Sequence, residues 1–390
     1  MTCVIRFQRQ RHCQWEMVLF SLDFRKPSKM RLFFIVLLGA HGLIHLIGFF
    51  KSQGFLESEQ LAFDIPQSRG ILWLAGGVLF LLTVLMYSVG YRYWWPFGIL
   101  AVIVSQGLII TQWKDAGFGT VANLIILIGC LIGGSYWQLD WSSEKEAARQ
   151  FLNTTKLASS TDLQIDDMPP LLGQWVYRSG VLNLPQIKSV KLEQKGKMRL
   201  KAGAKWTSFK AKQWFSLYPP GFLWIAQVGN PQSLMQFLGK DALNNGKGTM
   251  TIKLWGLLPI VQARGRDIDQ GSMIRYLAES IWFPSHMMSR SCTWTSIDSN
   301  HVKVHFKAGD QTANGVFGFD KSGELVSFSS MRYYDANNRL ERWVANIDPT
   351  SYQDFEGVRI PTKASITWEL TNGDFHWLEV EIITAVFNFS

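Results

Sequence analysis

The chain of 390 residues lacks the short motifs that identify most families of soluble enzymes. It has no G-x-S-x-G nucleophile elbow, no Walker phosphate loop and no dinucleotide-binding fingerprint. Cysteine is scarce, and Cys3, Cys13, Cys130 and Cys292 have no C-x-x-C spacing, so a thioredoxin-like site or zinc ribbon has no support. The C-terminal part contains Cys292 alone and therefore cannot form an internal disulfide. The sequence predicts no cofactor and no catalytic residue, and an enzyme is the less favoured class.

Charged residues are nearly absent from four apolar segments, which cover residues 32–50, 71–89, 96–110 and 118–136. A helix crosses a hydrocarbon core of about 30 Å with about 20 apolar residues, so most of these segments are long enough. The third is short unless Trp94 and Trp95 belong to it. Aromatic residues such as Tyr91 and Tyr93 gather near the segment ends, as they do at membrane interfaces. We predict a four-helix transmembrane domain over residues 30–139.

Lysine and arginine are unevenly distributed around these segments. The residues before the first segment include Arg6, Arg9, Arg11, Arg25, Lys26, Lys29 and Arg31. The next loop on that side carries Arg92, whereas the first loop on the opposite side has Lys51 and Arg69 among acidic residues. This bias predicts a cytoplasmic N-terminus in a multi-pass protein of the cell inner membrane, and four crossings return the C-terminal part to the cytoplasm. Residues 1–29 have no signal-peptide core. If Met30 is the true start, only Arg31 and Arg92 support the orientation.

The chain changes character after the fourth segment. Residues 140–168 are polar and predict a linker, and residues 169–390 predict a second domain of normal single-domain size. That domain shows period-two alternation, as in VKLEQKGKMRLK, which has the pattern of a hairpin turning at Lys195 and Gly196. Many short strands of this kind predict an α+β, mainly antiparallel β domain, with one helix near residues 274–281.

Two pairs of residues near that helix are expected at the surface. Arg275 and Glu279 are spaced to form a modest surface ion pair on the helix. Asp267 and Asp269 lie beside arginines and are expected to pair with them, rather than to act as a glycosidase-type carboxylate pair.

Three phrases carry a resemblance to a known family: WFSLYPPGFLWIAQV, GLLPIVQARGRDIDQGSMIRYLAESIWFP and VRIPTKASITWEL. They resemble an uncharacterised bacterial family whose recurring phrases are PPGF-x-W and RYLAE-x-x-W-x-P, over about residues 169–390. The family has no established activity, so no residue inherits a catalytic role. The order of strands and helix is more loosely similar to half-barrel domains that carry lipids or lipoproteins in bacteria. This likeness implies a curved sheet or half-barrel with one packed helix.

The break Pro219-Pro220-Gly221 separates two aromatic-rich runs and predicts a forced corner between two strands. Two interpretations of the neighbouring rings remain open. They either fill a solid core or line a groove for an apolar or lipidic ligand. The candidate ligand-binding residues are Trp214, Phe222, Trp224 and Trp282.

The sequence contains two histidine pairs with the same spacing, and we expect different roles for them. His41 and His45 share one helix face in the first apolar segment, where they either hydrogen-bond between helices or serve a metal, haem or proton relay. No third histidine lies in the other membrane segments. His301 and His305 lie on a predicted strand, about 13 Å apart, which is too far for one metal. We expect them to be exposed.

A basic run follows residue 187, and its candidate membrane-surface residues are Lys191, Lys197, Arg199 and Lys201. This face is either simply solvated or lies on anionic lipid head groups, and nucleic acid is the less favoured partner. We favour a membrane-tethered protein whose β domain binds an apolar or lipidic ligand. The alternatives are a membrane redox protein that uses His41 and His45, or a purely structural interaction module.

Overall fold

The computed structural model describes residues 29–55, 65–149, 165, 167–229, 236–334 and 339–388, without the side chains of residues 140 and 141. The chain forms two compact units, Met1–Trp137 and Gln138–Ser390. Each is described by itself.

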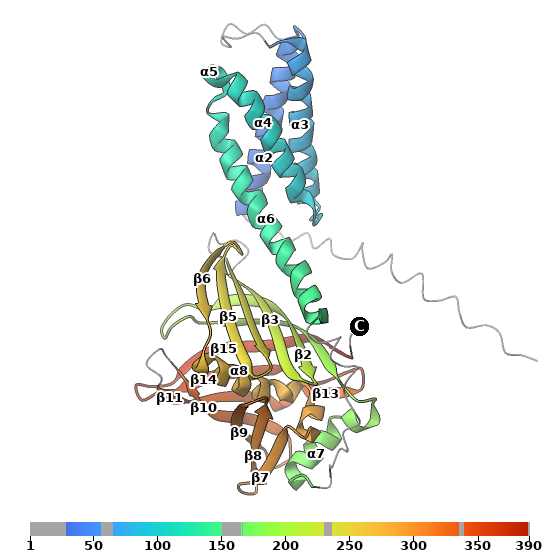
Figure 1. The fold of residues 1–390 in the computed structure, drawn as a ribbon, viewed down its shortest axis with the longest axis vertical. Coiled ribbons are helices and arrows are strands. Elements are labelled where there is room, and N and C mark those ends of the chain that lie inside the picture. The colour runs from blue at the N-terminus through green and yellow to red at the C-terminus, as the bar shows by residue number, and fades with distance from the viewer. Residues whose placement is uncertain are drawn as a thin grey trace, which may run out of the picture. The chain divides into compact units, whose positions relative to one another are not determined.

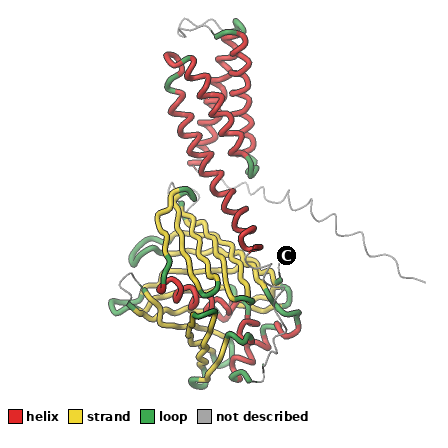
Figure 2. Tube along the Cα trace, in the orientation of Figure 1, coloured by secondary structure: helices red, strands yellow, loops and turns green. Residues whose placement is uncertain are grey.

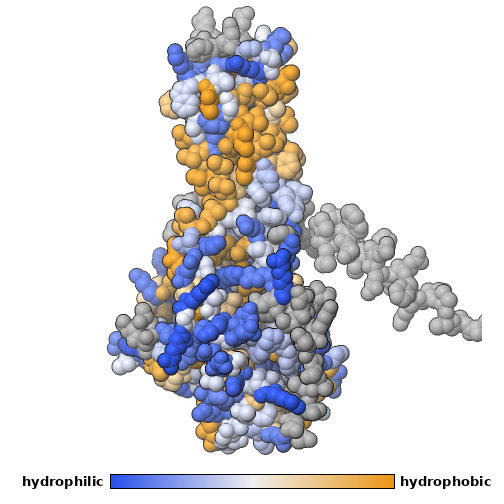
Figure 3. All heavy atoms as spheres, viewed as in Figure 1, coloured by the Kyte–Doolittle hydropathy of each residue, from blue (hydrophilic) through white to orange (hydrophobic). Residues whose placement is uncertain are grey.

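The first unit contains long apolar helices (Figure 1). They are α2 (Lys29–Ser52), α3 (Gln67–Ser88), α4 (Trp94–Thr111) and α6 (Gly119–Ala147), with the short α5 (Trp113–Ala116) before the last, and α6 continues into the second unit. All four long helices are, by length and composition, apolar enough to cross a membrane, so the four predicted apolar helices are confirmed. Trp94 and Trp95 do belong to the third, which lengthens it to 18 residues. Apolar side chains cover most of the visible outer surface of these helices (Figure 3).

Small residues let the helices of this bundle approach closely. A side-chain carbon at Gly77 of α3 would lie 2.8 Å from Leu46 and 3.0 Å from the carbonyl of Gly42, both on α2. In a bilayer, such contacts replace the hydrophobic effect as the source of helix association. Leu38 and Phe80 are fully buried in the interior of the bundle.

The second unit is built on one curved antiparallel sheet of 13 strands, in the order β6-β5-β4-β3-β2-β1-β15-β14-β11-β10-β9-β8-β7. Its strands are β1 (Ser189–Met198), β2 (Thr207–Leu217), β3 (Pro220–Val228), β4 (Phe237–Asn244), β5 (Lys247–Leu254), β6 (Leu258–Ala263), β7 (Cys292–Ser296), β8 (His301–Ala308), β9 (Gln311–Phe319), β10 (Leu325–Tyr333), β11 (Leu340–Ile347), β14 (Lys363–Glu369) and β15 (Phe375–Phe387). A separate hairpin contains β12 (Tyr352–Phe355) and β13 (Val358–Pro361). We call this curved sheet and its helices the half-barrel. Figure 2 shows the strands curving around a central helix.

That central helix is α8 (Arg266–Glu279), which packs against β4, β5, β9 and β10. It continues into the 3-10 turns η4 (Ser280–Trp282) and η5 (Pro284–Met288). A second helix, α7 (Pro170–Arg178), is followed by the turn η3 (Val181–Asn183), and η6 (Pro349–Ser351) precedes β12. Ile274 and Leu277 of α8 join Phe215 and Phe306 of the sheet in one large apolar core. The predicted fold class is confirmed.

The predicted turn at Lys195 and Gly196 is wrong. Strand β1 runs without interruption through both residues, and its partner β2 begins only at Thr207. Gly196 instead permits close packing, because a side-chain carbon there would lie 2.5 Å from the ring of Phe209. The glycine therefore serves the sheet interior rather than a turn.

The corner at the two prolines is where the sequence places it. Strand β2 ends at Leu217 and β3 begins at Pro220, so Tyr218 and Pro219 form a tight turn. The two strands pair as neighbours, with Phe215 opposite Phe222. The break therefore closes a hairpin between adjacent strands of the half-barrel.

Candidate functional site

A chain of buried polar side chains crosses the concave face of the half-barrel. The indole Nε1 of Trp224 donates to Oε1 of Gln194 at 3.0 Å, and Nε2 of Gln194 donates to Oε1 of Gln213 at 2.8 Å. Nε2 of Gln213 then donates to Oε2 of Glu279 on α8 at 2.7 Å. Gln194 and Gln213 occupy inward positions of β1 and β2, where alternation would otherwise place apolar residues.

Arg275 continues this chain on α8. Its Nε donates to Oε1 of Glu279 at 2.8 Å, and its Nη1 donates to Oδ2 of Asp241 on β4 at 2.7 Å. The guanidinium also lies 4.9 Å from the ring centre of Phe222 and 4.8 Å from that of Trp224. The expected surface pair is therefore wrong, because only 16% of the Arg275 side chain and 13% of the Glu279 side chain are exposed. Helical spacing could not show that this face of α8 lies on the sheet.

Burial sets the protonation preferences of this group. Desolvation raises the pKa of Asp241 and of Glu279, and the charge of Arg275 opposes the rise in both. The pKa of Arg275 is raised, since the attraction of Glu279 and Asp241 outweighs its own desolvation. The three groups are therefore mutually dependent, because the charge of one guanidinium opposes the effect of burial on the pKa of both carboxyls.

Arg332 of β10 brings a second guanidinium to this region. It lies 5.5 Å from the ring centre of Trp343 and 5.8 Å from that of Trp368. Its Nε would be only 2.9 Å from a side-chain carbon at Gly271, so the glycine leaves room for it beneath α8. Desolvation, followed by repulsion from Arg275, lowers the pKa of Arg332 to about 10, so it remains charged at neutral pH. Within the described residues, Arg332 has these ring contacts but no hydrogen bond or ion pair.

A pocket of about 410 Å³ joins these groups, and we call it the Arg332 pocket. Its cationic lining residues are Arg264, Arg266, Arg275 and Arg332, against the acidic Asp241 and Asp267. Its apolar and phenolic residues include Phe222, Met250, Ile268, Tyr333 and Tyr334. The first turn of α8, residues 266–268, forms part of the wall, and a helix N-terminus attracts negative charge through its free N–H groups. The pocket is thus suited to an anionic group beside apolar surface.

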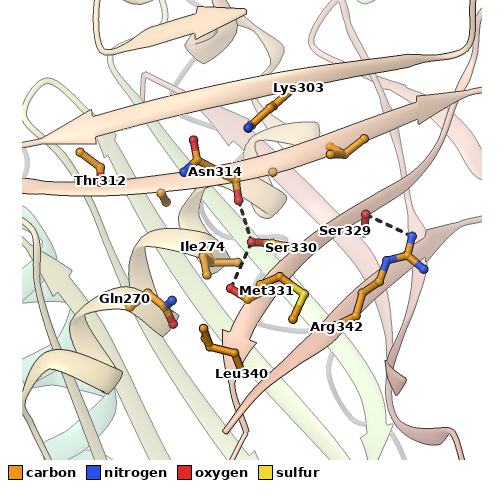
Figure 4. Close-up of a pocket in the computed structure, with 13 residues that line it drawn as sticks. Gln270, Ile274, Lys303, Thr312, Asn314, Ser329, Ser330, Met331, Leu340 and Arg342 are labelled. Carbon is orange, nitrogen blue, oxygen red and sulfur yellow. Dashed lines mark hydrogen bonds between the residues drawn. The ribbon is translucent and has the colours of Figure 1, made fainter. Parts of the chain in front are cut away.

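A second pocket, of about 470 Å³, involves β8 to β11 and α8 (Figure 4). Several of its polar groups already have protein partners. Oγ of Ser330 donates to the carbonyl of Asn314 at 2.6 Å. Nη1 of Arg342 donates to both carboxylate oxygens of Glu369, at 2.9 and 2.7 Å. Arg342 is thus neutralised and Lys303 is the other basic lining residue, so this pocket offers an anion less positive charge than the Arg332 pocket does.

The predicted aromatic residues do not form one group. Trp214 lies on the opposite face of the sheet from Phe222 and Trp224, where it packs with Leu223 and Ala147. Trp282 is 4% exposed within the core of the concave side. Phe222 lines the Arg332 pocket, and Trp224 is half-buried against Arg275. Of the four residues, Phe222 and Trp224 are therefore the two at the candidate site.

The predicted basic residues are partly neutralised by neighbours that are distant in sequence. Lys191 and Lys212 contact Glu144 of α6 at 3.3 and 3.5 Å. Lys197 pairs with Glu379 of β15 at 2.9 Å. Arg199 lies 4.3 Å from the ring centre of Trp206, and Lys201 is exposed in the loop after β1. Arg199 and Lys201 are thus the members of the predicted set without an acidic partner among the contacts that the structure describes.

His41 and His45 belong to a hydrogen-bonded cluster inside the bundle. Their Nε2 atoms lie 3.1 and 2.8 Å from Oγ of Ser105 on α4. Asn123 of α6 donates to the same oxygen at 3.0 Å and to Oε1 of Gln106 at 3.0 Å. Among the described residues, no three His, Cys, Asp or Glu side chains are grouped to hold a metal. The cluster joins α2, α4 and α6 through polar contacts.

Two other sequence expectations concern polar residues of the half-barrel. His301 and His305 are exposed on β8, as predicted, beside Asp298 and Asn314. Asp269 is not at the surface, since it is 4% exposed and accepts a hydrogen bond of 2.7 Å from the backbone N–H of Gly248. That part of the expectation is wrong, because the first turn of α8 packs against β5.

Two solved structures and one family model are similar to this chain. A putative outer membrane lipoprotein-sorting protein domain from Vibrio parahaemolyticus is similar at 10% identity and a TM-score of 0.33, covering 55% of this chain and 92% of that one. A DUF1329 family protein from Desulfovibrio piger is similar at 12% identity and a TM-score of 0.32, covering 57% and 95%. No curated protein matches the sequence. A model described as "Family of unknown function (DUF6544)" matches residues 158–380, more than half of the chain, so the protein belongs to this family.

Proposed function

We propose that this protein is a membrane-tethered binding protein whose half-barrel holds an amphipathic ligand with an acidic head group in the Arg332 pocket. The observation that carries the proposal is that the Arg332 guanidinium has no described hydrogen-bond acceptor. Its guanidinium has five N–H donors, lies in a desolvated position and has no acceptor among the described residues. Arg332 is half-buried and lines the pocket, so an anionic ligand there would supply the acceptor that the described residues do not.

The surroundings of Arg332 favour a carboxylate or phosphate. Arg275 already pairs with Asp241 and Glu279 through two of its five N–H groups, so its charge is compensated within the protein. Arg264 and Arg266 add positive charge beside the N-terminus of α8. A charge-assisted hydrogen bond contributes about 1.5 to 3 kcal/mol, which corresponds to roughly 10- to 100-fold in affinity.

The apolar part of the ligand follows from the remaining walls and from the tether. Phe222, Met250 and Ile268 supply apolar contact inside the pocket. Four helices that are able to span a membrane supply a tether to a bilayer, where amphipathic acids are abundant. We place the half-barrel on the cytoplasmic side from the lysine and arginine bias, and we assign Arg199 and Lys201 to contact with anionic head groups.

A photoactivatable fatty acid tests this function on the full chain in nanodiscs. We expect labelled peptides from β5, β6 and β10, because Met250, Ala263 and Tyr333 line the pocket. The variant Arg332→Met should lose most of this labelling. Arg342→Met, in the second pocket, is the matched control and should label like the wild type, since Arg342 lies away from the Arg332 pocket.

A fatty alcohol of equal chain length separates the acidic head from the apolar chain. If the alcohol labels the same peptides as strongly as the acid does, the head-group assignment is wrong. If neither probe labels the half-barrel above background, the binding function itself fails.

A further inference from the structure

The hairpin of β5 and β6 forms one edge of the sheet (Figure 1), and the sequence at its tip is apolar. We define the apolar tip as residues 254–260, with the sequence LWGLLPI. Leu257, Leu258 and Ile260 are 39%, 54% and 53% exposed. Exposed apolar side chains gathered in one short segment are uncommon on a soluble surface and mark a contact site.

The turn of this hairpin uses an unfavourable residue. Trp255 has a φ of 55° and Gly256 a φ of 71°, and the N–H of Leu257 donates to the carbonyl of Leu254 at 3.1 Å. Asparagine or glycine normally occupies a left-handed turn position, because a bulky side chain is strained there. Trp255 is half-buried and has contacts within the protein, so the exposed apolar side chains of the tip are Leu257, Leu258 and Ile260.

Charge on the hairpin has a single sign. From Ala242 to Arg266 the sequence contains no aspartate or glutamate, whereas Lys247, Lys253, Arg264 and Arg266 are basic. Lys253 is the cation next to the tip, whereas Lys247, Arg264 and Arg266 lie towards the opposite end of the hairpin, where Lys247 pairs with Asp269 at 3.0 Å. An apolar tip with an adjacent cation matches the boundary between acyl chains and anionic head groups.

The edge strand β6 is poorly suited to pair with a strand from a second copy of the chain. Pro259 has no N–H to donate, and the register of β5 and β6 shifts between Ile252 and Lys253, leaving Ile260 as an extra residue. Proline and bulges are the features that prevent edge strands from pairing with other strands. The exposed side chains of the tip therefore remain available to a partner that needs no backbone pairing.

We infer that the apolar tip inserts into the lipid bilayer at the head-group boundary. The four apolar helices of the same chain keep the half-barrel covalently attached to that bilayer. Insertion gives the half-barrel a second membrane attachment. This inference does not depend on the Arg332 pocket, and either can fail without the other.

The test uses the full chain at one copy per nanodisc, with its four native cysteines replaced by alanine. Leu258→Cys carries an environment-sensitive NBD label, and Lys321→Cys, in the exposed turn after β9, is the matched control. Lipids with a shallow doxyl group quench NBD on contact. We expect several-fold stronger quenching at position 258 than at position 321, with a blue-shifted emission.

Changing the charge of the lipid or of the tip provides a second test of insertion. Quenching at position 258 should weaken when anionic lipid is replaced by neutral lipid, and also in the variant Ile260→Glu. Equal quenching at positions 258 and 321 in anionic nanodiscs would overturn insertion. Disulfide crosslinking between copies of the Leu258→Cys variant in multi-copy vesicles, without lipid quenching in single-copy nanodiscs, would instead assign the tip to self-association.

Discussion

Replacing Arg275 by methionine tests whether the buried charges beneath α8 depend on one guanidinium. Arg275 contacts Asp241 at 2.7 Å and Glu279 at 2.8 Å, and these carboxylate side chains are 24% and 13% exposed. Methionine retains much of the length but removes the charge. Two desolvated carboxylates then lose the guanidinium that is hydrogen-bonded to both, and breaking such a buried pair typically costs about 3 to 5 kcal/mol. Domains are stable by about 5 to 15 kcal/mol, so the variant should fold but be weakened.

The loss should depend on pH. Burial already raises the pKa of Asp241 and of Glu279, and removing Arg275 removes the strongest opposing influence on both. A carboxyl whose folded pKa is raised stabilises the fold below its unfolded pKa, near 4, and loses this contribution as pH rises through the folded pKa. Arg275→Met should therefore be most destabilised, relative to the wild type, at pH 8, and should partly recover towards pH 5.

Hydrogen exchange of α8 amides, followed by mass spectrometry on the full chain, measures the opening free energy at both pH values. Adding Asp241→Asn and Glu279→Gln to Arg275→Met removes both charges and should restore most of the stability and abolish the pH dependence. Arg342→Met removes an ion pair whose partners are 52% and 40% exposed, and should cost about 1 kcal/mol or less. If Arg275→Met costs no more than this control at pH 8, the three charges are not coupled as described.

Three further predictions concern the bundle and its orientation. Ser105→Ala removes the hydroxyl that contacts both histidines and Asn123, and thermal unfolding should show the bundle destabilised by about 1 kcal/mol. The control Thr111→Val loses one hydrogen bond to the backbone of its own helix and should have a smaller effect. Elemental analysis and visible spectra should show no stoichiometric metal or haem, because Ser105 lies against both Nε2 atoms; a metal that His45→Ala removes would contradict this. A C-terminal cytoplasmic reporter should be active and alkaline phosphatase inactive, and the opposite pattern would reverse the proposed orientation.

The helices of the bundle could be predicted best, because the hydropathy that indicates them is a property of each segment alone. Hydropathy within each segment determines whether a helix can span a membrane, and it needs no knowledge of distant contacts. The hydrogen-bonded cluster around Ser105 could not be predicted from the sequence in the same way. His41 and His45 were visible as a pair, but nothing in the sequence placed Ser105 of another helix between them. Helix packing in a membrane depends on steric contacts between segments, which composition does not specify.

In the half-barrel, alternation predicted strands but not their partners. Strand β1 pairs with β15, near the other end of the domain, so Lys197 lies opposite Glu379 and Lys195 opposite Glu381. A basic run in sequence thereby becomes a mixed surface in the sheet. A detectable signal was missed at Gln194, which continues the inward positions of Val190 and Leu192. A polar residue at an inward strand position indicates a buried hydrogen-bond partner, and this inference needs only the sequence pattern.

The inward polar residues also bear on why the half-barrel is built this way. Apolar residues of similar volume can replace a buried ion pair at no cost or with a gain in stability, so stability alone does not account for Asp241, Arg275 and Glu279. These three groups nevertheless satisfy one another, whereas Arg332, on the facing strand, is left with ring contacts among the described residues. A core selected only for packing would more readily contain leucine at Arg332 than a guanidinium beneath Gly271. Three of the four charged groups are paired with one another and Arg332 is not, and this difference favours a ligand that supplies an acceptor to Arg332.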